Sequence, residues 1–289
     1  MDAVLRLRRL HGLRHRARRG IGDTTGGRKS GDRAGPLGRR RDPRRVAEPI
    51  EHRRRVIIRL RFSKNGKIRF IGHRDVARVF ERAMRAANLP VAYSEGFSPR
   101  PKLAFGLALA VGYESDNEYL DVVLSEPVEL ADVCARLSAT LPAGLDLIDV
   151  GHLDRRGTSL MEAVTSCEWV IDVEHEDPNA LRASVDALLA ADRVIITRER
   201  KGKPVEDNIR PDLLSLKVLM NTENATNRIV AELGTEGRSL RPAEMLTALS
   251  TALTVTRVRR THQWISHGED RIEPHEAAVS RAAYTGACA

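Results

Sequence analysis

The feature that most constrains the fold is a change of pattern at Val56. Before it, arginines and glycines follow one another without an apolar period. After it, Val56, Ile58, Leu60 and Phe62 alternate with mostly basic neighbours, which is the period-2 pattern of a half-buried β-strand. We therefore expect the folded part of the chain to begin at residue 55.

The net charge of +9 belongs to the segment before this boundary. Residues 1–55 hold 18 of the 48 Lys and Arg residues and 6 of the 39 Asp and Glu residues, which leaves 30 basic and 33 acidic residues for 56–289. The folded part is slightly acidic, which argues against a strong general RNA binder. We interpret residues 1–54 as a disordered basic tail or the product of a wrongly assigned start codon, because glycines and Pro36 break any long amphipathic helix.

Cysteine usage and hydropathy indicate the compartment. Cys134, Cys167 and Cys288 are odd in number and far apart, which suits a reducing environment. No apolar run reaches the 18 residues of a membrane-spanning helix, and the N-terminus lacks the apolar region of a secretory signal. We expect a cytoplasmic protein.

Residues 55–152 form a first predicted unit with the order β-α-β-β-α-β. A tight turn at 64–67 follows the first strand, because Asn65-Gly66 accepts positive φ. A short return segment at 68–71 then leads into a helix near Asp75, and a second helix opens at Pro127. The other strands are predicted over residues 103–111, 118–124 and 145–150. In the strand 118–124, Leu120, Val122 and Leu124 form the inward set.

The same order recurs in residues 167–265. Strands are predicted over 167–173, 193–198 and 254–260, a hairpin over 213–219 and 227–233, and helices over 179–189 and from Pro242 to 253. Residues 153–166 are interpreted as a connector, and residues 266–289 as a frayed C-terminal tail. The prediction is an α+β fold of two ferredoxin-like (βαββαβ) halves in tandem.

The helix near Asp75 has two distinct faces. Its apolar face carries Val76, Val79, Phe80, Ala83, Met84 and Ala87, and its opposite face carries Arg74, Arg78, Arg82 and Arg85. These arginines either form a basic stripe for phosphates or belong to a solvated face, where Glu81 would pair with Arg78 and Arg85.

Residues 93–102, Tyr-Ser-Glu-Gly-Phe-Ser-Pro-Arg-Pro-Lys, are the most unusual stretch. Two prolines and a glycine forbid a helix and stiffen the loop. It carries a phenol, a carboxylate and two cations, at Tyr93, Glu95, Arg100 and Lys102, and rigid loops are where binding groups concentrate. The alternative is a structural turn that covers a sheet edge.

A second group of candidates lies where the first strand leads into the helix. Lys64, Arg69, His73 and Asp75 surround a predicted helix N-terminus, which favours anions. His73 is the weak candidate for a catalytic residue, as a proton carrier, and its alternative is a structural cap. No pair of Cys or His residues has zinc-finger spacing, so no metal site is expected.

Several of these segments follow one another at characteristic spacings. Phe62-Ser63-Lys64, the segments 69–75, 93–102 and 118–121, and Leu141-Pro142-Ala143-Gly144-Leu145 together resemble the bacterial family of radical-SAM-linked (radical-SAM-associated) domains of unknown function. The segments 207–211 and Arg241-Pro242 fit more loosely. The resemblance covers roughly residues 56–262 and none of the N-terminal tail.

The resemblance implies a partner. Domains of this family are fused to a radical SAM protein or are encoded near one, so the partner is expected to carry an iron–sulfur cluster and S-adenosylmethionine. This chain lacks the three-cysteine cluster motif, and we expect it to bind no cofactor. Family members usually carry His where this chain has Arg100. Because Arg cannot exchange a proton near neutral pH, this difference favours anion binding by Arg100 and Lys102.

The leading hypothesis is thus a non-catalytic accessory subunit that binds the substrate of a radical SAM enzyme, with RNA or a translation component as that substrate. The alternatives are an independent RNA-binding protein or endoribonuclease and, least favoured, a small-molecule enzyme using His73, Asp75 and Glu95. We further expect Arg69, His73, Tyr93, Arg100 and Lys102 to line one anion-binding surface.

Overall fold

A computed structural model describes residues 55–153, 158–174, 177–219, 226–249, 252–268 and 270–277. These residues belong to one compact unit that spans Ile50–Ala289. The prediction of a basic tail over residues 1–54 lies outside the described residues.

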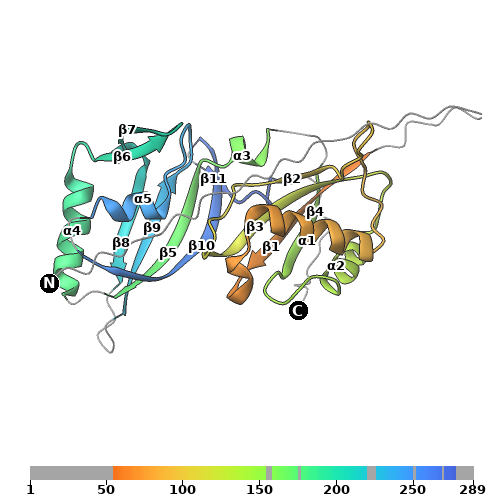
Figure 1. Cartoon of the computed structure of the whole chain (residues 1–289), viewed down its shortest axis with the longest axis horizontal. Helices are drawn as coiled ribbons and strands as arrows, with labels where there is room; N and C mark the ends of the chain where they lie inside the picture. Colours follow the sequence, from red (N-terminus) through yellow and green to blue (C-terminus); the bar gives the residue numbers. More distant parts are fainter. Residues whose placement is uncertain are drawn as a thin grey trace, which may run out of the picture. The chain divides into compact units, whose positions relative to one another are not determined.

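The first half is built on four strands and two helices. β1 (Val56–Lys64) pairs antiparallel with β3 (Glu114–Leu124) on one side and with β4 (Leu147–Leu153) on the other, and the short β2 (Leu103–Phe105) pairs with β3. A 3₁₀ turn, η1 (Gly66–Phe70), precedes α1 (His73–Ala86), and α2 (Leu130–Ser138) precedes β4. Both helices pack on the same face of these strands (Figure 1).

The second half repeats this arrangement. β5 (Ser166–Glu174) pairs antiparallel with β10 (Thr254–His267) and with β9 (Thr226–Gly234), and β9 pairs with β8 (Leu213–Leu219). The helices are α4 (Pro178–Ala190) and α5 (Pro242–Thr247), and a turn, η2 (Arg210–Asp212), precedes β8. β6 (Ile195–Arg200) and β7 (Lys203–Asn208) form a separate two-stranded hairpin.

The two halves share one sheet. Its order is β4-β1-β3-β10-β5-β9-β8, with β2 added to β3 and the short β11 (Asp270–Ile272) added to β10. The halves meet where β3 and β10 pair in parallel, at Glu114 with Arg259 and at Ser115 with Arg260. The α+β class predicted from the sequence is confirmed, and the strands of both halves form a single mixed sheet.

The predicted register of β3 is confirmed. Leu120, Val122 and Leu124 are completely buried and belong to the first core, together with the alternating Ile58, Leu60 and Phe62 of β1. The core faces of the two strands therefore match, as the period-2 pattern requires.

The segment after β2 departs from the prediction. The sequence predicts a strand over residues 103–111, but pairing stops at Phe105. Leu103 and Phe105 pack on the first core, whereas Leu107 and Leu109 pack on the core of the second half. We call residues 103–109 the crossing segment, because it contributes to both cores.

The expected C-terminal tail is partly ordered. β10 continues to His267, β11 follows, and Glu273, Pro274 and His275 contact the first half. Pro274 accepts a hydrogen bond of 2.8 Å from Arg59, and the carboxylate of Glu273 accepts one of 3.1 Å from Asn117. The prediction of a frayed tail is therefore wrong for residues 266–268 and 270–277, and residues 278–289 lie outside the described part.

Other boundaries shift by a few residues. The connector 153–166 contains the end of β4, the short helix α3 (Leu160–Ala163) and the start of β5, and its Leu160 and Val164 are buried. The return segment at 68–71 is not a strand but largely the turn η1. α2 begins at Leu130 rather than at Pro127, and α5 ends at Thr247 rather than at residue 253.

Candidate functional site

The loop at residues 93–102 is a narrow, closed excursion of the chain. Tyr93 and Pro101 form an isolated antiparallel bridge. Inside it, the backbone N–H of Ser94 donates to the carbonyl of Arg100 (2.8 Å), and the N–H of Arg100 donates to the hydroxyl of Ser94 (3.0 Å). Gly96 has φ +121, a backbone conformation that favours glycine. The loop is thus held by its own hydrogen bonds.

Most side chains of this loop face solvent, and Lys102 is half-buried. Glu95 and Arg100 are exposed, Tyr93 is 47% exposed, and Phe97 at the tip is fully exposed. Among the described residues, none of the side chains of Tyr93, Glu95, Arg100 and Lys102 makes a hydrogen bond or an ion pair. These groups are therefore available to a ligand.

Lys64 is not available in this way. It is buried, and its Nζ donates to the carbonyls of Arg69 (3.2 Å) and Ile71 (3.0 Å). Burial lowers the pKa of Lys64, the nearby charge of Glu118 opposes this effect, and that of Arg260 adds to it. Lys64 therefore ties β1 to the chain that leads into α1, which is a structural role that the sequence does not indicate.

Arg69 is also engaged within the protein. Its guanidinium lies 4.6 Å from the ring centre of Phe70 and donates to the buried carboxylate of Glu114 at 3.2 Å. Glu114 also accepts from the backbone N–H of Gly66 (3.1 Å) and from Arg257 (2.5 Å). Burial alone would raise the pKa of Glu114, but the hydrogen bonds from Arg257 and Gly66 and the charges of Arg257 and Arg259 outweigh it, so the pKa is lowered.

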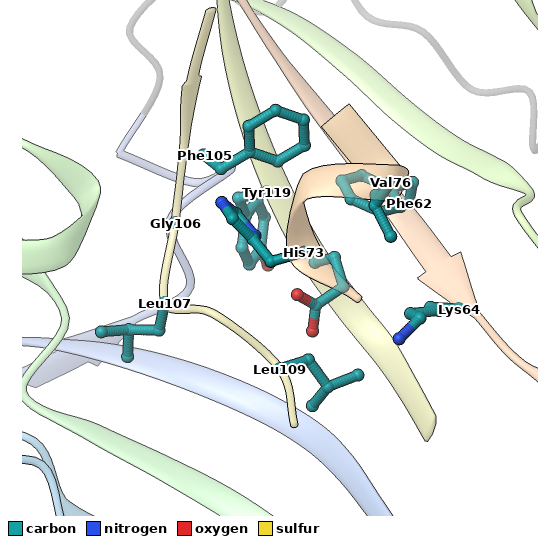
Figure 2. Close-up of a pocket in the computed structure, with 10 residues that line it drawn as sticks. Phe62, Lys64, His73, Val76, Phe105, Gly106, Leu107, Leu109 and Tyr119 are labelled. Atoms are coloured by element: carbon teal, nitrogen blue, oxygen red, sulfur yellow. The ribbon is translucent and has the colours of Figure 1, made fainter. Parts of the chain in front are cut away.

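His73 and Asp75 lie at the start of α1 but do not form a joint site. His73 is exposed and packs edge-on against Phe105, with the ring centres 5.1 Å apart. Asp75 accepts from Arg78 at 2.9 Å. A cavity of about 20 Å³ lies beside His73, bordered by Lys64, Glu118 and the crossing segment (Figure 2). Such a volume holds about one water molecule, which is too small for a substrate.

The expectation that one surface is lined by Arg69, His73, Tyr93, Arg100 and Lys102 is wrong. Lys64 pairs with Ser115 at the start of β3, whereas the carbonyl of Lys102 accepts from Val123 near its end. His73 begins the 14-residue helix α1, and Tyr93 borders a hollow at the last turns of that helix. The two groups are separated by the length of α1, about 20 Å at 1.5 Å per residue. Sequence proximity does not reveal at which end of a strand a loop emerges.

The exposed face of α1 carries more free charge than expected. Of its four arginines, only Arg78 has a carboxylate partner among the described residues, namely Asp75. The expected pairs of Glu81 with Arg78 and Arg85 are not observed there. Arg74, Arg82 and Arg85 are exposed. We call Arg74, Arg78, Arg82 and Arg85 the arginine row.

Two hollows flank α1, and each has a member of the arginine row on its rim. One, of about 310 Å³, lies between the last turns of α1 and the loop, and its rim includes Arg85 and Tyr93. The other, of about 280 Å³, lies between α1 and residues 140–142, and its rim includes Arg82. Neither hollow can be predicted from the sequence, because each is formed by segments that are distant in the chain.

Some signature residues have structural roles. Within the segment 118–121, Glu118 binds the buried Arg260 (2.6 Å) and Asp121 binds Arg59 (2.7 Å). Gly144 has φ +89 and lies against the carbonyl of Asn65, so that a Cβ would clash. At these three positions the motif residues stabilise the fold and are not free to bind a ligand.

The described part of the chain offers neither a metal centre nor a membrane-spanning helix. It contains no group of three or more His, Cys, Asp or Glu side chains that could hold a metal ion. None of its helices is long and apolar enough to cross a membrane.

The fold and site define an α+β protein with an exposed cationic and aromatic surface on its first half. The chain belongs to a family of uncharacterized proteins conserved in bacteria (DUF2344), whose model matches residues 57–242. No protein of curated function matches the sequence.

Among solved structures, the chain is similar to one in a Cbf5-Nop10-Gar1 complex, with 12% identity, a TM-score of 0.41 and coverage of 72% of this chain and 48% of the other. It is also similar to one in an archaeal box H/ACA sRNP Nop10-Cbf5 complex, with 13% identity, a TM-score of 0.37 and coverage of 75% and 50%. The chain spans about half the length of either matched chain, and neither similarity is close enough to define its fold or activity.

Proposed function

We propose that this chain is an accessory, substrate-binding partner of a radical SAM enzyme, with RNA as the substrate. The resemblance of segments 62–64, 69–75, 93–102 and 118–121 to radical-SAM-linked domains supports the partnership. In this proposal the partner holds the iron–sulfur cluster and S-adenosylmethionine, the chain works in the cytoplasm, and each half is a ferredoxin-like unit.

The arginine row is the observation that carries the proposal of RNA binding. From Arg74 to Arg85 it extends about 17 Å along α1, a length that suits several phosphates of a nucleic-acid strand. Arg is well matched to phosphate because its planar guanidinium donates two parallel hydrogen bonds. Arg100 and Lys102 on the neighbouring loop extend the same charge, and Tyr93 and Phe97 add exposed aromatic rings. Cations interleaved with aromatic rings are typical of surfaces that bind single strands.

The slight acidity of residues 56–289 does not oppose this proposal. The face formed by α1 and the loop carries six cations, the arginine row with Arg100 and Lys102, against three carboxylates, Asp75, Glu81 and Glu95. The local charge of the face formed by α1 and the loop is therefore positive even though the folded part as a whole is not.

RNA binding is tested with single-stranded oligonucleotides at several salt concentrations. The variant Arg74→Ala/Arg82→Ala should bind more weakly, and its log–log salt slope should fall by about 1 for each phosphate that it no longer neutralises. The matched control is Arg182→Ala, which removes an exposed arginine of α4 in the second half. Equal binding by the wild type and the Arg74→Ala/Arg82→Ala variant would contradict the proposal. Cleavage of the RNA by this chain alone would favour the endoribonuclease alternative.

The partnership is tested by reconstitution with a radical SAM protein encoded beside this chain. We expect co-elution of the two proteins and turnover that depends on this chain. The variant Arg100→Ala/Lys102→Ala should lower turnover while the partner keeps the absorbance of its cluster. A radical SAM protein that neither binds this chain nor responds to it would remove the partnership and leave RNA binding as a separate question.

A further inference from the structure

The hollow beside the last turns of α1 has the features of a small-ligand site. Its floor includes apolar side chains, the buried Met84 and Leu89 and the half-buried Val91, while its lining as a whole is more polar than apolar. Its volume of about 310 Å³ lies at the lower end of the range for ligand pockets. It is large enough for a flat heterocycle and is open to solvent on one side.

Four polar or aromatic side chains surround this floor. They are Glu81, Arg85, Asn88 and Tyr93, and none of them makes a side-chain hydrogen bond or an ion pair within the described part of the protein. Glu81 and Arg85 are four residues apart on α1, a spacing that permits an ion pair, yet they remain separate. Such a hollow, with apolar side chains at its floor and unused polar groups around it, suits a ligand that has an apolar face and a polar edge.

The rim of the hollow is fixed in place. Arg136 of α2 donates to the carbonyl of Ala87 at 2.8 Å and to that of Asn88 at 2.5 Å. Asn88 adopts φ +48 and ends the helix there. On the other side, the bridge between Tyr93 and Pro101 holds the backbone of Tyr93 at the edge of the hollow. The backbone that carries Asn88 and Tyr93 is therefore held in place, and their side chains are free to meet a ligand.

We propose that this hollow binds one guanine base of a single-stranded RNA, a step that rests on the proposed RNA-binding function. Tyr93 supplies a face for base stacking. The carboxylate of Glu81 only accepts hydrogen bonds, and the Watson–Crick edge of guanine offers two adjacent donors, N1–H and the N2 amino group. The corresponding edge of adenine presents an acceptor at N1, which a carboxylate repels. Arg85, a member of the arginine row, binds the phosphate of the same nucleotide.

The experiment uses the full chain and measures binding of GMP and AMP by calorimetry. We expect GMP to bind about tenfold more tightly than AMP, and Tyr93→Ala to weaken GMP binding about tenfold, in line with typical losses of base stacking. Tyr93→Phe keeps the ring and should retain the affinity, which separates stacking from any effect on folding. Glu81→Gln should abolish the preference for GMP while leaving the shape of the hollow unchanged.

The control is Arg182→Ala, which should leave GMP binding unaltered. No binding of GMP by the wild type, or a preference that survives Glu81→Gln, would overturn the guanine site. If oligonucleotides still bind and lose affinity in Arg74→Ala/Arg82→Ala, the RNA-binding function stands without this site. If neither GMP nor any oligonucleotide binds, the proposed function has failed as well.

Discussion

The arginines of α1 and two arginines of the second half, Arg210 and Arg260, are used in opposite ways. Arg260 is 2% exposed, pairs with Glu118 and donates to the carbonyl of Leu107 at 2.8 Å. Arg210 donates to the carbonyls of Leu189, Ala191 and Leu213. In contrast, three of the four arginines in the arginine row have no carboxylate partner among the described residues.

The difference teaches that partners, not residue type, separate structural arginines from those that are free to bind a ligand. A guanidinium that satisfies buried carbonyls and carboxylates is needed for folding, because its loss leaves those groups without a partner. A guanidinium that faces only water contributes little to stability and is free to bind phosphate. Sequence alone shows both kinds as the same letter.

The largest expected effect concerns a structural arginine, Arg260. Arg260→Met should lower the free energy of unfolding by about 3–5 kcal/mol, because Glu118 is then left buried without its counter-charge. Chemical denaturation measures the loss. Arg260→Met/Glu118→Leu should recover much of it, since no lone charge remains. A fully stable Arg260→Met would mean that this arginine is not part of the folding framework.

An intermediate effect concerns Glu114, which links the two halves by binding Arg69 of the first half and Arg257 of the second. Its lowered pKa means that its stabilisation is complete above the unfolded value of 4.5 and is lost as the pH falls through the folded value. Glu114→Gln should therefore cost on the order of 1–2 kcal/mol at pH 7, and less below pH 4.5. A cost that does not change over this range would show that charge is not its source.

The smallest effect concerns the exposed arginines of the arginine row. Arg74→Ala and Arg82→Ala should each change the free energy of unfolding by less than about 0.5 kcal/mol, as is usual for surface substitutions. Thermal unfolding with circular dichroism is sufficient to measure this. A loss of several kcal/mol from either variant would show that the arginine row is needed for folding. The contrast with Arg210 and Arg260 would then not hold.

Local patterns predict much of the fold. The alternation of Val56, Ile58, Leu60 and Phe62 marks β1, and the pairing of β8 with β9 follows from two adjacent strand patterns. Such signals depend only on neighbouring residues, which is why they can be read from a sequence.

The errors involve interactions between residues that are distant along the chain. Glu273, Pro274 and His275 are ordered through Asn117, Arg59 and Tyr119, which the polar composition of the C-terminus does not reveal. Leu107 and Leu109 do not continue β2, because they pack in the core of the second half. Lys64 is predicted as a binding residue, but its ammonium donates to two carbonyls of the protein instead.

The candidate site can be predicted only in part. The stiff loop with Tyr93, Arg100 and Lys102 is identified from its prolines, whereas the hollow that adjoins Tyr93 requires Glu81 and Asn88 at the far end of α1. Chain order does not specify that juxtaposition. The arginine row is visible as a pattern in the sequence, but its lack of partners is not.

The crossing segment has a consequence for how the protein can be divided. Its Leu103 and Phe105 pack in one core and its Leu107 and Leu109 in the other, and Arg260 holds the carbonyl of Leu107 between them. A fragment cut near residue 152 would expose two leucines to water and leave Glu118 without its partner. The repeated halves are therefore not interchangeable modules, and a fusion or truncation that preserves the protein must keep residues 55–277 together.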